Sequence, residues 1–178
     1  MGARLQGEVI DSEQFNWFFQ RFGHSRLPAV NYSGGTEASE ALVASVPCRP
    51  IKPCSFNSTS PEIDTYVVYE SGARIVGAEG EMVEGSPFIG MTNGPWNEAT
   101  RYMETYWSAH PGMWTHGDLA VEENDGSFFI LGRSYDALKI AGKRVGPAEL
   151  EALAQAVTGA AQVARQRPSG ILSKVRRL

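Results

Sequence analysis

Three short segments of the sequence gather glycines, carboxylates and basic groups within a few residues of one another. The segment NYSGGTE (31–37) places two glycines ahead of Thr36 and Glu37. Glycine lets backbone N–H groups approach a phosphate closely, and the Thr36 hydroxyl can donate a further hydrogen bond. Glu37 can hold Mg²⁺, which prefers oxygen ligands beside phosphates, and Tyr32 can stack on a base. A glycine-rich turn with a capping Thr-Glu pair is the simpler alternative, so this segment alone leaves both interpretations open.

The other two segments add a carboxylate and several cations. In HGDLAV (116–121), Asp118 comes just before an apolar run and could accept hydrogen bonds from two ribose hydroxyls. An Asp that closes its own turn is equally compatible with this pattern. The segment LGRSYDALKIAGKRVGPAELE (131–151) could direct guanidinium groups at a phosphate, or present a solvated basic face. Its cations before the closing glutamates are Arg133, Lys139, Lys143 and Arg144.

Hydrophobic spacing and turn residues predict the elements that carry these segments. A helix capped by Asp11 or Ser12 and ended by Gly23 would place four aromatic residues on one face. These are Phe15, Phe18, Phe19 and Phe22. Residues 27–32 (LPAVNY) are typical of a buried strand that runs into the glycine loop.

Two hairpins and two further helices are predicted downstream. The first hairpin covers 65–76 with a turn at Ser71-Gly72, and the second covers 119–132 with a turn at Asp125-Gly126. Residues 97–107 predict a short helix capped by Asn97, and another helix is expected from Pro147. The order of elements indicates an α/β (mixed α+β) protein in which strands and loops dominate the middle.

Composition excludes several classes of protein. The chain has 178 residues, a net charge of −4 and 42% hydrophobic residues, which gives no general reason to expect a nucleic-acid or membrane partner. No stretch approaches the roughly 20 apolar residues of a membrane span, and the first residues lack the apolar core of a secretory signal. Cys48 and Cys54 are expected to be reduced structural residues, so a cytoplasmic location is predicted.

The order of the motifs carries more information than any one of them. GE (7–8), NYSGGTE, GEMVEGSPFIGMT, WTHGD and GRSYDALKIAGKRVGPAELE follow one another over residues 5–155. In this order they resemble the adenylate-forming, AMP-dependent acyl-CoA synthetase family, most closely its acetyl-CoA-synthetase-like acid–CoA ligases. The resemblance implies the C-terminal, strand-rich half of the large AMP-binding domain in residues 1–134. The hinge and a truncated small C-terminal lid domain would follow in residues 135–178.

The resemblance also implies an activity and a set of residue roles. Such ligases use ATP and Mg²⁺ to adenylate a carboxylic acid and then transfer the acyl group to coenzyme A. At the matching positions, the residues beside adenine would be Gly7, Glu8, Asn31 and Tyr32. The phosphate would lie at the loop of Gly35, with Thr36 on the adenylate phosphate, Arg144 nearby and Glu37 on Mg²⁺. Asp118 and Arg133 would hold the ribose hydroxyls, and Gly142 would line the pantetheine path.

Departures from the family pattern lead to further expectations. The family's phosphate-gripping loop and its lid lysine have no match in the sequence, so the isolated chain is expected to be inactive or weakly nucleotide-binding. Lys174 is a candidate for that lysine, and Tyr135 occupies the hinge position where the family usually has Asp or Lys. Gly34 takes the place of a bulky aromatic residue that closes the acyl pocket in acetate-specific members, which predicts a longer acid.

Two other classes of function are compatible with the sequence. The chain could be a non-catalytic binding module derived from this family, pairing with a polypeptide that supplies the missing N-terminal half. Exposed apolar surface would favour that alternative. A nucleic-acid binder would depend on the basic tail at 165–178, which has no interleaved aromatic residues, and a solvated terminus explains that tail more simply.

Overall fold

The computed structural model describes residues 3–5, 9–136, 138–140 and 143–145. The helical elements among these residues are α1 (Ser12–Gly23), α2 (Ala99–Tyr106) and the 3₁₀ turn η1 (Ser134–Asp136). The strands are β1 (Ala3–Leu5), β2 (Ala29–Gly34), β3 (Ala41–Ala44), β4 (Ser58–Thr59), β5 (Thr65–Val68), β6 (Arg74–Ile75), β7 (Glu79–Glu84), β8 (Trp114–Glu122), β9 (Phe128–Arg133), β10 (Leu138–Ile140) and β11 (Lys143–Val145). The predicted mixed α/β class is confirmed.

The predicted first helix is confirmed, and it is capped by Asp11. The Asp11 Oδ1 atom accepts a hydrogen bond from the backbone N–H of Gln14 at 2.8 Å, which satisfies one of the free donors at the helix start. The helix ends at Gly23, and His24 follows it in the left-handed conformation with φ 50°. Phe15 is buried, whereas Phe22 is 54% exposed, so the aromatic face is only partly covered by the described residues.

A four-stranded sheet in the order β1-β2-β3-β4 positions the glycine loop. β1 runs parallel to β2, and the other pairs are antiparallel. The register between β2 and β3 shifts between Ser33 and Gly34. The chain leaves this irregular strand end directly into the Gly35–Glu37 loop, which therefore lies at the end of an inner strand of the sheet.

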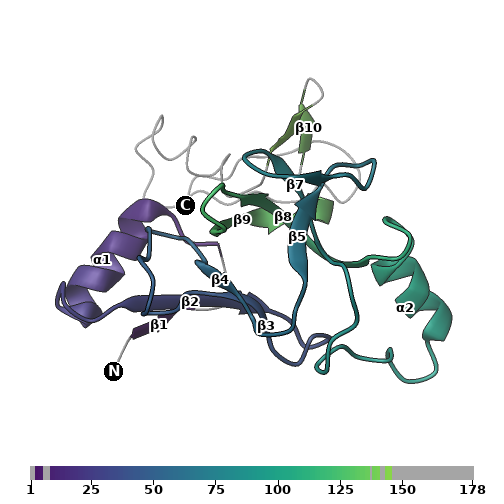
Figure 1. Cartoon of the computed structure of the whole chain (residues 1–178), viewed down its shortest axis with the longest axis horizontal. Helices are drawn as coiled ribbons and strands as arrows, with labels where there is room; N and C mark the ends of the chain where they lie inside the picture. Colours follow the sequence, from purple (N-terminus) through teal and green to yellow (C-terminus); the bar gives the residue numbers. More distant parts are fainter. Residues whose placement is uncertain (1–2, 6–8, 137, 141–142, 146–178) are drawn as a thin grey trace, which may run out of the picture.

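The second sheet is antiparallel throughout and has the order β6-β5-β7-β8-β9. Both predicted hairpins belong to it, and both of their turns contain a glycine with positive φ: 81° at Gly72 and 76° at Gly126. In Figure 1, α1 and the four-stranded sheet lie at the left, α2 lies at the right, and the five-stranded sheet lies between and above them.

The hydrophobic core joins the two sheets and α2. Leu42 and Val43 of β3 belong to the same buried cluster as Val67 and Met82 of the second sheet and Tyr102 of α2. The predicted Asn97 cap of α2 is wrong: Glu98 holds the cap position without a side-chain hydrogen bond. Asn97 instead has φ 55°, a left-handed conformation that asparagine tolerates better than most residues.

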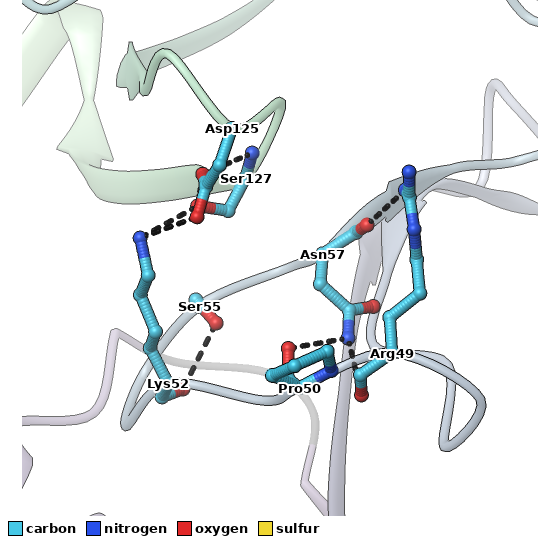
Figure 2. Close-up of polar contacts among 7 residues, drawn as sticks. All are labelled: Arg49, Pro50, Lys52, Ser55, Asn57, Asp125 and Ser127. Atoms are coloured by element: carbon cyan, nitrogen blue, oxygen red, sulfur yellow. Dashed lines mark hydrogen bonds and ion pairs between the residues drawn. The ribbon is translucent and has the colours of Figure 1, made fainter.

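The loop between β3 and β4 is fastened at two points, as Figure 2 shows. The buried side chain of Asn57 donates to the carbonyls of Val46, Arg49 and Pro50 and accepts from the Val46 N–H at 2.7 Å. Lys52 pairs with Asp125 at 2.6 Å, which ties the loop to the β8–β9 turn. The buried Asn57 is the stronger of the two anchors, because Lys52 and Asp125 are both about half exposed.

The end of the described chain forms a small separate hairpin. β10 pairs with β11 in antiparallel register, with Lys139 opposite Arg144. The predicted helix from Pro147, the basic tail and Lys174 lie outside the described residues, so they stay predictions. The boundary after residue 134 also stays a prediction. Cys48 and Cys54 are both free thiols.

Candidate functional site

Asp118 on β8 is the centre of a polar cluster that also contains the buried His116 of β8 and the partly exposed Arg133 of β9. Its Oδ2 atom lies 2.8 Å from His116 Nδ1, and its Oδ1 atom lies 3.1 Å from Arg133 Nη1. Arg133 also donates from Nη1 to the His116 carbonyl at 3.1 Å. Strand pairing causes this arrangement, because Asp118 and Arg133 are direct partners in the β8–β9 register. A carboxylate has about four lone-pair positions, so Asp118 keeps acceptor capacity beyond these two contacts.

The glycine loop forms a tight turn of its own. The N–H groups of Ala38 and Ser39 both donate to the Gly35 carbonyl, at 3.1 and 3.0 Å. The Glu37 carbonyl accepts from the Thr92 N–H at 2.8 Å, which anchors the loop to the chain that follows β7. Thr36 is exposed on this turn and Glu37 is half-buried, so their side chains are accessible from solvent to different degrees.

The loop and the Asp118 cluster meet at His116. A Cβ atom added to Gly35 would lie 2.9 Å from His116 Nε2 and 3.4 Å from Glu37 Oε2. Any side chain at position 35 would therefore displace the imidazole, so glycine is needed for this close approach. Sequence reasoning identified Asp118 and Gly35 but did not select His116. The only available signal was its place two residues before Asp118 on one strand.

Two aromatic residues, Tyr106 of α2 and Trp114 of β8, pack beside His116 and form an aromatic wall of the site. Tyr106 stacks on Trp114 with ring centroids 5.1 Å apart and planes at 7°, and Trp114 lies 5.7 Å from the His116 ring. Burial raises the pKa of the Tyr106 hydroxyl, and the nearby Glu37 carboxylate raises it further by its charge and a hydrogen-bond contact. Tyr106 is therefore a second link from the wall to the Gly35–Glu37 loop. Sequence reasoning missed both aromatic residues.

A buried carboxyl group lies beside this wall. Glu84 is 1% exposed and is the direct strand partner of both Thr65 and Trp114. Among the described residues no hydrogen bond of standard geometry reaches its carboxyl oxygens, although the Thr65 hydroxyl is near enough to act on its pKa. Desolvation raises the pKa of Glu84 to about 8, the Thr65 hydroxyl opposes this, and the charges of Asp64 and Asp118 add to it.

Gly34 has a packing constraint of its own. A Cβ atom there would lie 2.0 Å from the Glu40 carbonyl oxygen and 2.9 Å from the Ala41 Cα atom. The backbone of β3 therefore fills the space next to Gly34 that a side chain would first enter. The assignment of Gly34 to an acyl pocket stays a prediction.

Comparisons with known proteins identify the family. No protein-family model matches the chain. An acetyl-coenzyme A synthetase of Pyrobaculum arsenaticum is 34% identical over 149 residues, which cover 82% of this chain and 22% of that protein. One from Pasteurella multocida is 35% identical over 149 residues, covering 82% of this chain and 23% of that protein. The chain belongs to the AMP-dependent acyl-CoA synthetase family.

A solved structure agrees with this family assignment at the level of the fold. The acetoacetyl-CoA synthetase from Streptomyces lividans superposes with a TM-score of 0.78 over 96% of this chain and 28% of that chain, at 23% identity. The strand-rich fold predicted from the family resemblance is therefore confirmed. The chain spans about a quarter of the length of the family members it matches.

The structure brings only part of the predicted family site together. Asp118 and Arg133 are in contact, and His116 and Tyr106 connect them to Gly35 and Glu37. Asn31 is buried and its carbonyl accepts from Ser45 N–H at 2.7 Å, while Tyr32 is half-buried on the same strand. Arg144 is described only by its backbone pairing in β11, and Tyr135 is 68% exposed in η1. Three predicted site residues lie outside the part of the chain that the structure describes: Gly7, Glu8 and Gly142.

Glu37 is the carboxylate that the Gly35–Glu37 loop offers to a cation, and the described residues add no larger set of metal ligands to it. No group of three or more His, Cys, Asp or Glu residues in the described part of the chain could hold a metal ion. Mg²⁺ commonly takes one or two protein carboxylates and completes its shell with phosphate oxygens and water. A half-buried Glu37 beside an exposed Thr36 fits that mode of binding. In the same part of the chain, no helix is long and apolar enough to cross a membrane.

Proposed function

We propose that the chain is part of an acid–CoA ligase that adenylates a carboxylic acid with ATP and then forms a thioester with coenzyme A. The single observation that supports this most strongly is the Asp118 carboxylate, which His116 and Arg133 hold beside the Gly35–Glu37 loop. A fixed carboxylate can accept hydrogen bonds from two ribose hydroxyls, and a glycine turn can admit a phosphate within reach of the same nucleotide.

The remaining roles come from the family resemblance, and the side-chain chemistry of Thr36, Glu37 and Arg144 agrees with it. Thr36 would donate to the adenylate phosphate, and Arg133 would hold the ribose hydroxyls together with Asp118. Glu37 would hold Mg²⁺, which supplies charge neutralisation of the phosphates when bound. Arg144 would approach the phosphate. Adenine would lie beside Gly7, Glu8, Asn31 and Tyr32, and Gly142 would line the path of pantetheine.

We further propose that the 178-residue chain binds AMP weakly by itself and turns over little substrate. It spans about a quarter of its relatives, so a whole ligase would supply further contacts to the reacting phosphates. Residues 1–134 would belong to the AMP-binding domain and residues 135–178 to the hinge and lid, with Tyr135 at the pivot. The protein would act in the cytoplasm, on an acid longer than acetate.

Equilibrium dialysis with radiolabelled AMP tests the binding part of this proposal. Wild-type chain is expected to bind one AMP with a Kd of about 1 mM or lower, and Asp118→Ala to bind at least about 100-fold more weakly, since two hydrogen bonds to a charged group are lost at about 1.5–3 kcal/mol each. Absence of saturable binding by a folded wild-type chain would refute the proposal. Acid-dependent exchange of pyrophosphate into ATP tests turnover, and clear exchange would overturn the expectation of an inactive chain.

A non-catalytic module that pairs with another polypeptide is the second candidate. The exposed aromatic residues of α1 favour it, because Trp17 is 59% exposed and Phe22 is 54% exposed. Their rings also contact one another at 5.7 Å, so they form one continuous patch. If this patch pairs with the upstream half of a ligase, Trp17→Ala should abolish the pairing and leave AMP binding by the chain unchanged.

A further inference from the structure

We infer that His116 is a positioning residue that fixes the Asp118 carboxylate and the Gly35–Glu37 loop in one relative arrangement. This inference depends on the proposed function, because it assigns His116 a part in recognising the ribose of a nucleotide. Asp118 is the group that would touch the ribose. His116 acts through it and is not itself a catalytic residue.

The hydrogen bonding of the imidazole determines its orientation. Its Nδ1 atom lies 2.8 Å from Asp118 Oδ2, and a carboxylate oxygen accepts, so Nδ1 is the donor. The opposite edge of the ring, at Nε2, then faces Gly35, whose absent Cβ would lie 2.9 Å away. One rigid ring therefore spans the distance between the two parts of the site, and its length sets their separation.

The ring has little freedom to move. Its side chain is 4% exposed, and one face packs near Trp114, whose ring is itself stacked on Tyr106. The backbone of His116 is held as well, because its carbonyl accepts from Arg133. A shift of the imidazole would therefore disturb the ribose carboxylate, the loop and the aromatic wall together.

Discrimination between AMP and its 2′-deoxy analogue separates positioning from a general effect on stability. The wild-type chain should bind AMP about tenfold more tightly than 2′-deoxy-AMP, because the analogue lacks the 2′-hydroxyl and keeps only its 3′-hydroxyl to donate to Asp118. In His116→Ala the carboxylate loses its orientation, so the ratio of the two affinities should fall to about 1. A purely structural role would weaken both ligands equally and leave this ratio unchanged.

Two conservative variants make the test independent of a folding defect. An asparagine amide can take the place of Nδ1 and donate to Asp118, so His116→Asn should restore most of the discrimination. A glutamine amide reaches the place of Nε2 instead, so His116→Gln should not restore it. His24→Asn is the matched control, since His24 is exposed in the left-handed conformation at the end of α1, which asparagine accepts.

The outcomes distinguish this inference from the proposed function. If the wild-type chain binds neither ligand, both fail. If it discriminates and both His116→Ala and His116→Gln discriminate equally well, His116 is not a positioning residue, while the proposed function stands. Nitrogen NMR of the imidazole in slightly alkaline buffer gives a readout without any ligand: the tautomer protonated at Nδ1 should dominate the His116 signal. A dominant Nε2 tautomer would overturn the inference.

Discussion

Glu84→Gln should change how the stability of the chain depends on pH. The carboxyl group is 1% exposed and pairs across the sheet with Thr65 and Trp114, and no hydrogen bond of standard geometry reaches it from the residues that the structure describes. Burial raises its pKa from the ordinary 4.5 to about 8. Glutamine has almost the same shape and carries no charge at any of these pH values, so the substitution removes the ionisation and preserves the volume.

The sign and size of the effect follow from this shift. Below the unfolded pKa the group is protonated in both states and costs nothing. As the pH rises from about 4.5 to about 8, the unfolded chain ionises while the folded chain must keep the proton, so the free energy of unfolding falls. A range of about 3.5 pH units at about 1.4 kcal/mol each gives a loss of about 5 kcal/mol as an upper bound. Above about pH 8 the loss is complete.

Urea unfolding followed by tryptophan fluorescence measures this directly. Between about pH 5 and pH 8, Glu84→Gln should become progressively more stable than the wild-type chain, and the two should be similar at the acidic end. Glu104→Gln is the control, because Glu104 is exposed on α2. If the Glu84→Gln curve stays parallel to the wild-type curve over this range, the carboxyl group does not hold its proton in the folded state and the argument is refuted.

Three further substitutions test the fold around the site. Asp11→Ala should cost about 1 kcal/mol of stability by removing the cap on Gln14, and Asp11→Asn should restore most of it; equal urea midpoints for all three chains would contradict the cap. Gly34→Ala should cost about 1–3 kcal/mol, since its Cβ would lie 2.0 Å from the Glu40 oxygen, and an unchanged melting temperature would exclude that contact. Leu42→Ala should cost about 2–5 kcal/mol because Leu42 is fully buried between the sheets, and a loss well under 1 kcal/mol would exclude this core.

Local signals predicted local elements well. The spacing of phenylalanines with the Asp11 cap located α1, and the Asp125-Gly126 turn located the β8–β9 hairpin, because both depend on neighbours in the sequence. Strands β3 and β4 were not predicted. Both are short: β3 is stabilised by pairing with β2 and by packing in the core shared with the second sheet, and β4 by pairing with β3, which a local pattern does not encode.

Only the site residues whose own type and motif indicated a role were predicted from the sequence. Asp118 and Arg133 were selected separately, and the β8–β9 register then placed them in contact. His116, Tyr106 and Trp114 were missed, because their importance comes from the meeting of β8 with α2 and the glycine loop. Aromatic and imidazole side chains at these spacings are also common in ordinary cores, so the sequence alone had no reason to prefer them.

The most direct test of the central claim is a crystal structure of this chain with AMP. The ribose 2′ and 3′ hydroxyls should lie within hydrogen-bond distance of the Asp118 carboxylate, and the phosphate should lie beside the Thr36 hydroxyl. The imidazole of His116 should keep its contact with Asp118 in the complex. An ordered AMP bound elsewhere, or one whose ribose points away from Asp118, would contradict the account.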